Sequence, residues 1–180
     1  MYFSEVRPQE EITQQLRTLT TGKLRLYALI DAAHTATKLQ MIRQHVSFDA
    51  ALGLFAGMPE QDAQSAGPFL LQLNPFETTH EARISWLIKA QILAPCVTWI
   101  WSEAIPSVLH RHLQQQLIAK LPDGNEALLR FYDPRVLQQL LTTLFNTEQT
   151  KALLGPIVRW HWYLPETGQQ AYSTDTTAVS

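Results

Sequence analysis

The chain has 180 residues, of which 46% are hydrophobic and 17% are charged, and its formal net charge is −2. This length fits one domain, and the hydrophobic fraction is sufficient for a core. Phosphate binding needs clustered Lys and Arg, and no basic run here reaches five residues, so the composition argues against nucleic acid as a partner.

Cysteine usage and the apolar segments bear on the compartment. Cys96 is the only cysteine, so no intramolecular disulfide can form and an oxidising compartment is not indicated. The N-terminus, MYFSEVRPQEEI, is polar and acidic, unlike a signal peptide. The longest apolar stretch, around 92–101, is shorter than the ~20 residues that span a bilayer. We therefore expect a cytoplasmic protein without a membrane partner.

Helix and strand patterns alternate along the chain. The first helix is expected between Pro8 and Gly22, and composition predicts a loop at 57–68. Strands are expected at 24–30, 69–73, 96–102, 127–132 and 157–164. Further helices are expected around 39–46, 77–93, 107–117, 134–144 and 147–154.

This alternation is typical of an α/β fold. It predicts a single domain, residues 1–165, with a central mixed sheet of about five strands flanked by helices. Residues 166–180 contain few large apolar groups, so they are expected to form a flexible polar C-terminal tail.

The segment ALLRFYDPRVLQQLL, residues 127–141, contains an unusual strand-to-helix junction. Asp133 stands where a helix cap is needed, and Pro134 suits the first helical position. Arg135 could form a local ion pair with Asp133. Arg130 lies within an apolar run, and a buried arginine needs a carboxylate, for which Asp31 and Asp133 are the candidates.

A second hypothesis places a small-molecule or enzymatic site at the strand ends, where ligands of open α/β sheets bind. Its residues would be Asp31, His34, Arg130 and Asp133, with His34 as a possible general base. The sequence has no GxGxxG, GxxxxGK[ST] or GxSxG motif to support nucleotide binding or hydrolysis. We therefore expect no catalytic residue and no cofactor.

The histidines and the cysteine do not indicate a metal centre. His110 and His112 lie two residues apart on a predicted helix, so their side chains point about 200° apart. No HExxH motif or cysteine cluster completes a metal site. Cys96 is expected to be a buried small hydrophobe.

Four tryptophans lie on two predicted strands: Trp99 and Trp101 on one, Trp160 and Trp162 on the other. One tryptophan of each pair is expected in the core and the other on the opposite face. If no helix covers that face, it would form an apolar contact patch.

An ordered series of segments resembles the DUF4123 family, the adaptor or chaperone proteins of bacterial type VI secretion. The segments are LYALIDAA, LFAGMPE, AGPFLLQL, the SWL helix, TWIWS, LPDGNEALLRFYDPRVLQQLLTTL and LLGPIVRWHW. Together they cover about residues 24–164, and LRFYDPRVL is the most specific. Many relatives carry a further helical lobe after the last strand, where this sequence has 16 residues after Leu164.

The resemblance implies an adaptor that is not an enzyme. Family members bind a toxic effector in the cytoplasm and help to load it onto the trimeric VgrG spike. The expected partners are therefore an N-terminal helical segment of an effector and the VgrG spike protein, on surfaces not yet assigned. A structural or regulatory component of the secretion machine that binds no effector is a third hypothesis. The residues expected to support the fold are Asp31, Arg130, Asp133, Arg135 and Trp160.

Overall fold

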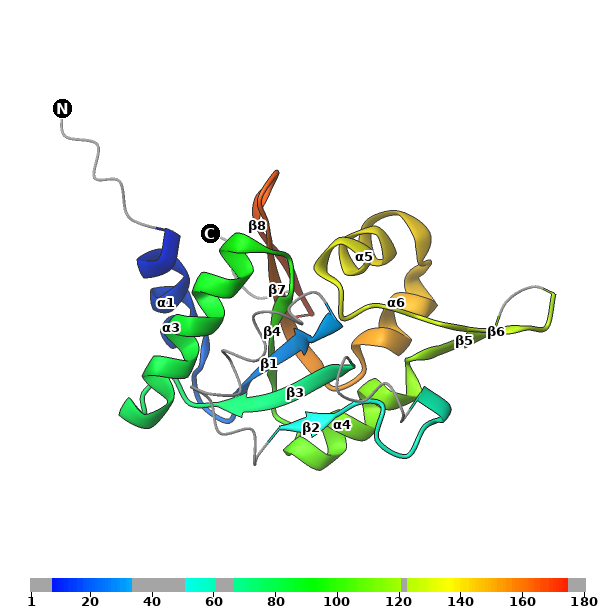
Figure 1. Ribbon diagram of the computed structural model, residues 1–180, viewed down its shortest axis with the longest axis horizontal. Coiled ribbons are helices and arrows are strands. Elements are labelled where there is room, and N and C mark those ends of the chain that lie inside the picture. Colours follow the sequence, from blue (N-terminus) through cyan, green and yellow to red (C-terminus); the bar gives the residue numbers. More distant parts are fainter. Residues whose placement is uncertain (1–7, 34–50, 61–66, 121–122, 175–180) are drawn as a thin grey trace.

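The computed structural model describes residues 8–33, 51–60, 67–120 and 123–174. Its main strands are β1 (Arg25–Asp31), β2 (Leu52–Gly53), β3 (Pro68–Leu73), β4 (Val97–Ser102), β7 (Ile157–Leu164) and β8 (Gly168–Ser173). Within these residues they form one sheet in the order β2-β3-β1-β4-β7-β8. Strands β5 (Ile118–Lys120) and β6 (Glu126–Leu128) form a separate hairpin, which extends away from the body in Figure 1.

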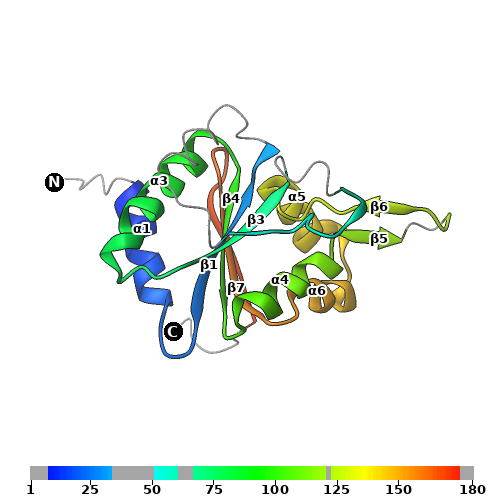
Figure 2. The ribbon, with the colours of Figure 1, turned by 60° about the horizontal axis from the view of Figure 1, so that its bottom comes forward.

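Helices cover both faces of the sheet. They are α1 (Pro8–Leu19), α3 (Thr78–Leu93), α4 (Pro106–Gln115), α5 (Pro134–Gln139) and α6 (Thr147–Leu154). A π-helical turn, η4 (Leu140–Leu144), continues α5. Figure 2 shows three layers, with α1 and α3 on one side of the sheet and α4, α5 and α6 on the other. The predicted fold class, a single α/β domain with a sheet flanked by helices, is confirmed.

The direction of the strands differs from the prediction of a mixed sheet. Every strand pair among the described residues runs antiparallel. Strands β3 and β4 are joined by α3 and run in the same direction, but β1 lies between them and opposes both. The segment β3-α3-β4 is therefore a crossover whose two strands do not pair with each other, because β1 lies between them.

The alternation of side chains along β1 builds a separate core on each face. Leu26, Ala28 and Ile30 join the cluster that packs under α1 and α3. Tyr27 and Leu29 join the cluster under α4, α5 and α6. Because β1 is buried on both faces, its sequence reads as a nearly continuous apolar run rather than as an alternating one.

The four strand tryptophans are core residues and do not form a surface patch. Trp99 and Trp101 both face α1 and α3, whereas Trp160 and Trp162 both face the other helical layer. The expected division of each pair between two faces was wrong, because residues two apart on a strand share a face. Their indole N–H groups donate to Gln91, Thr20, Thr98 and Gln138 respectively. Trp160, expected to support the fold, is fully buried.

The predicted strand at 127–132 does not join the central sheet. Residues 126–128 form β6, and 131–133 turn into α5. Phe131 and Tyr132 are buried in the core beneath α5. A short apolar run without alternation indicates that a segment is buried, but it does not show whether that segment is a strand. The buried residues here lie in an irregular segment, which produces the same pattern.

The tail predicted from Glu166 onward is also corrected. Residues 168–173 form β8, which pairs with residues 159–164 along the outer edge of β7. Tyr172 packs against the core cluster under α4, α5 and α6. Most side chains of this edge strand are polar, but backbone hydrogen bonds stabilise it. Amino-acid composition does not indicate these hydrogen bonds, so the strand was not predicted. The helix expected around 39–46 and residues 175–180 lie outside the described residues.

Removing β8 should destabilise the domain. A chain that ends at Thr167 loses the ladder along β7 and the packing of Tyr172. We expect the free energy of unfolding to fall by about 3 kcal/mol, the order of magnitude for losing a packed aromatic side chain. Denaturant unfolding measures it, with a chain that ends at Thr174 and keeps the whole strand as the control. Equal stability of the two chains would contradict a structural role for β8.

Candidate functional site

The end of the central strand β1 holds a buried carboxylate. Asp31 has 0% exposure, and its Oδ1 accepts a hydrogen bond from the backbone N–H of Ala33 at 3.0 Å. Its Oδ2 accepts one from the Arg130 guanidinium at 3.4 Å, from 99 residues later in the sequence. The Arg130 side chain is 47% exposed, so the ion pair joins a core anion to a surface cation. The expected carboxylate partner of Arg130 is confirmed.

Asp133, the other candidate partner, organises the start of α5. Its Oδ1 accepts the backbone N–H of Arg135 at 3.0 Å, which is the predicted helix cap. The Arg135 guanidinium donates to both carboxylate oxygens, from Nε at 3.0 Å and from Nη2 at 2.7 Å. The cap and the local ion pair are therefore confirmed. Arg130 lies 4.0 Å from Asp133 Oδ2, so this one cation faces two buried carboxylates.

Tyr132 belongs to the same cluster and was not singled out from the sequence. The Arg130 guanidinium carbon lies 5.8 Å from the centre of its ring, within reach of a cation–π contact. Burial raises the pKa of the Tyr132 phenol, and Arg130 opposes the increase only in part. Burial lowers the pKa of Arg130, but Tyr132, Asp31 and Asp133 outweigh it, so the Arg130 pKa stays above its ordinary value. An arginine two residues before a tyrosine in an apolar run was the available signal.

The structure thus brings together four of the residues singled out from the sequence: Asp31, Arg130, Asp133 and Arg135. His34 lies outside the described residues. The two carboxylates interact with guanidinium groups and backbone N–H groups, and these contacts hold the end of β1 to the start of α5. The exposed parts of the cluster are the guanidinium groups of Arg130 and Arg135. At the surface, the cluster could therefore contact an anionic group.

The remaining polar candidates have separate structural contacts. His110 Nε2 lies 2.9 Å from the Gly53 carbonyl oxygen, and His112 Nε2 lies 2.8 Å from that of Leu153. The two rings therefore attach α4 to different neighbours. Over the described ranges, no three His, Cys, Asp or Glu side chains are grouped as metal ligands, and no helix is long and apolar enough to cross a membrane. Cys96 is buried, as expected.

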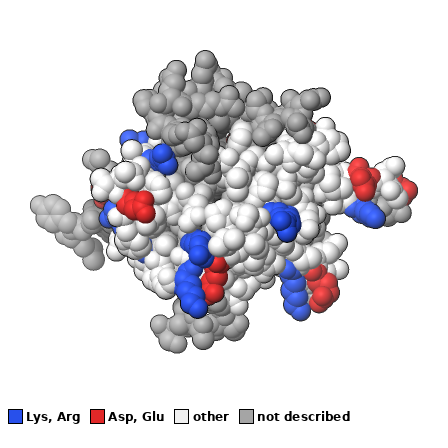
Figure 3. Space-filling model, turned by 90° about the horizontal axis from the view of Figure 1, so that it is seen from below, with Lys and Arg blue, Asp and Glu red and all other residues white. Residues whose placement is uncertain are grey.

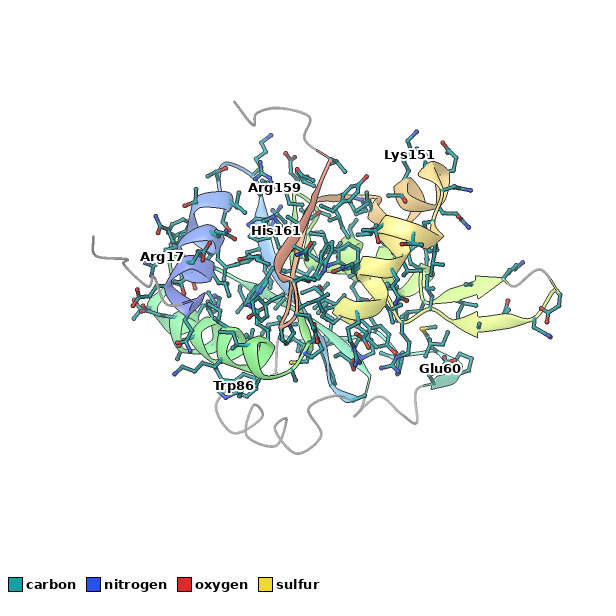
Figure 4. The ribbon with its side chains drawn as sticks, turned by 90° about the horizontal axis from the view of Figure 1, so that it is seen from above. Arg17, Glu60, Trp86, Lys151, Arg159 and His161 are labelled. Atoms are coloured by element: carbon teal, nitrogen blue, oxygen red, sulfur yellow. The ribbon has the colours of Figure 1, made fainter. Side chains whose placement is uncertain are left out.

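His161 is a buried titratable residue that the sequence reasoning missed. It lies between Trp160 and Trp162 on β7, so alternation turns it toward α1, as Figure 4 shows. Its ring packs edge-on against Trp101 with the ring centres 4.8 Å apart, and its Nδ1 atom has no hydrogen-bond partner. Burial, with a smaller effect of Arg159, lowers the pKa of His161 from 6.5 to about 4. A histidine between two strand tryptophans was the available signal.

Replacing Arg130 with methionine should destabilise the fold through Asp31. The methionine keeps most of the aliphatic stem but removes the cation that faces the buried carboxylate. Breaking a fully buried ion pair costs about 3–5 kcal/mol, and the half-exposed guanidinium reduces this, so we expect roughly 2 kcal/mol. Denaturant unfolding of Arg130→Met, Asp31→Asn and the double variant gives the coupling energy. A coupling below about 0.5 kcal/mol would show that the pair adds nothing.

His161 should make the fold sensitive to acid. The unfolded chain protonates this ring near pH 6.5, whereas the folded protein does so only near pH 4. Above pH 6.5, titration of His161 therefore does not change the free energy of unfolding. As the pH falls from 6.5 to 4, this titration lowers the free energy of unfolding by about 3 kcal/mol. Unfolding of wild type and His161→Phe at pH 7 and pH 4 isolates this contribution. An equal loss in both proteins would show that His161 is not the cause.

Comparison with known proteins identifies the family of the chain. A model of the family described as "Domain of unknown function (DUF4123)" matches residues 26–151, well over half of the sequence. The matched stretch includes β1 from Leu26 to Asp31 and the segment from Arg130 to Arg135. No curated protein and no solved structure matched the chain. The chain therefore belongs to the DUF4123 family.

Proposed function

We propose that the chain is an adaptor, or chaperone, of bacterial type VI secretion that binds a toxic effector in the cytoplasm and helps to load it onto the VgrG spike. The observation that carries this proposal is the family match over residues 26–151. The matched stretch contains most of the segments through which the sequence resembles the adaptors, including LRFYDPRVL. An adaptor acts through contact surface, so the proposal assigns no catalytic residue and no cofactor.

The surface supports a protein that acts by contact. Five large apolar side chains among the described residues are exposed: Phe76, Leu93, Ile105, Val108 and Leu144. Ile105 and Val108 stand three residues apart at the start of α4, so they lie close together on one side of the helix. Figure 3 shows the molecule from below the view of Figure 1. On this face the charged side chains are scattered and do not gather into a basic patch. Such a surface suits a protein partner better than nucleic acid.

The contacts of the Asp31 cluster support the adaptor over a small-molecule site at the strand ends. Both carboxylates have guanidinium and backbone N–H partners within the fold. These pairings account for two buried charges without a ligand, because a buried carboxylate needs a partner of this kind. In this proposal the Asp31 cluster has a structural role: it holds the fold together and does not bind a ligand.

Co-expression tests the adaptor function directly. An apolar effector segment should be insoluble alone, and its apolar side chains should become buried against the adaptor. We expect this chain to keep the N-terminal region of the toxin encoded beside it soluble, and to co-purify with that region. A separate co-purification uses the C-terminal end of the neighbouring spike protein. The toxin region expressed alone is the control.

Secretion from a deletion strain provides the second readout. A strain that lacks this gene should retain the toxin inside the cell, and the plasmid-borne gene should restore its secretion. The proposal fails if neither partner co-purifies and the toxin is secreted normally without the gene. An arrangement of the gene between a spike gene and a toxin gene would support it further.

A further inference from the structure

Strand β8 forms an open edge of the central sheet. Among the residues that the structure describes, β8 pairs with β7 on one side and with no strand on the other. None of its six residues is buried. Figure 4 views the molecule from this side, with β8 between the layer of α1 and α3 and the layer of α5 and α6. Strand β8 follows the stretch that the family model matches, so the family match does not describe this edge.

The ladder between β7 and β8 determines which backbone groups point outward at this edge. The Thr174 N–H donates to the Val158 carbonyl at 2.9 Å, immediately after the strand. The pairing of β7 with β8 continues from there without a shift in register. Along an antiparallel pair, successive residues direct their N–H and C=O groups alternately toward the neighbouring strand and away from it. The N–H and C=O groups of Gln169 and Ala171 therefore point away from β7.

Strand β8 has none of the features that usually keep an edge strand from pairing with another chain. Those features are charged side chains, proline, a β-bulge or a very short strand. Residues 167–174 read TGQQAYST, without a charge or a proline. The pairing with β7 is regular over six residue pairs. The opposite edge of the sheet is β2, which is only two residues long. The unprotected edge therefore indicates that another strand pairs with β8.

The sequence of β8 is complementary to itself in an antiparallel pair. When Gln170 lies opposite Gln170 of a second copy, Gln169 of each copy lies opposite Ala171 of the other. The outward N–H and C=O groups of these two residues then bond to each other. The same register places Tyr172 opposite Gly168 in both halves of the pair, and the glycine leaves room for the aromatic ring. No like charges meet, because the strand carries none.

We infer that the open edge of β8 pairs with β8 of a second copy of this chain, about a two-fold axis at Gln170. Such a pair covers β8 in both copies and leaves the short strand β2 at each end of one continuous sheet. The effector segment expected from the family resemblance is helical, whereas a sheet edge accepts an extended segment. The dimer is therefore separate from the proposed function, and neither depends on the other.

Charged substitutions at the two-fold axis test the pairing. The wild-type chain should dimerise with a dissociation constant on the order of 10 µM, because two short strands bury a small area. Gln170→Lys and Gln170→Glu each place like charges opposite one another, so each should dimerise about fivefold more weakly at low ionic strength. An equimolar mixture of the two variants should form a heterodimer at least as tight as the wild-type dimer. Sedimentation equilibrium measures the three constants.

The matched control is Gln72→Lys, which adds the same charge at an exposed position on β3 and should dimerise like the wild type. Melting midpoints show whether each variant folds. A wild-type chain that stays monomeric at about 500 µM would overturn the inference, because a weaker pairing would not cover the edge. A dimer that the Gln170 variants do not weaken, or that Gln72→Lys weakens equally, would overturn it as well. All of these outcomes leave the adaptor proposal standing.

Cysteine cross-linking tests the register of the two copies. Opposite residues that do not exchange hydrogen bonds have Cα atoms about 4.5 Å apart, which is within the range of a disulfide. Gln170→Cys should therefore form a disulfide-linked dimer under mild oxidation, whereas Ala171→Cys should not, because Ala171 lies opposite Gln169. The native Cys96 is buried and does not compete. Electrophoresis without reducing agent detects the product. Cross-linking of Ala171→Cys alone would overturn the register, and cross-linking of neither variant would overturn the pairing.

Discussion

The buried carboxylate of Asp31 is the constraint on which the arrangement of this domain depends. It ends the central strand, between β3 and β4, and has no access to solvent. A charge in that position is costly unless a cation and hydrogen-bond donors reach it. Arg130 supplies the cation, which requires the segment before α5 to cross the end of β1.

The position of that segment then determines the packing of one helical layer. Phe131 and Tyr132 follow Arg130 directly and are buried beneath α5. Asp133 comes next, where it caps α5 and faces the same arginine. One ion pair between distant parts of the chain therefore places two core aromatics and a helix start. This explains why the segment that most resembles the family pattern carries charged residues within an apolar run.

The four strand tryptophans are covered on both faces of the sheet, so they are not available to a partner of the proposed adaptor. Trp99 and Trp101 are covered on one face and Trp160 and Trp162 on the other, and each indole has a hydrogen-bond acceptor. Contact surface must therefore come from the helices, the sheet edges and the grooves between them.

Local patterns in the sequence were enough to predict most of the helices and strands, the fold class, and the junction at Asp133, Pro134 and Arg135, although the strand expected at 127–132 was wrong. These depend on interactions within a few residues, such as a helix cap, a fixed proline φ angle and hydrophobic periodicity. The tertiary structure alone decided the antiparallel strand order, the inclusion of 168–173 as β8, and the isolation of unprotonated His161 beside Trp101. Each of these results from backbone pairing or packing between segments distant in the sequence, and neither composition nor periodicity records which segments will meet.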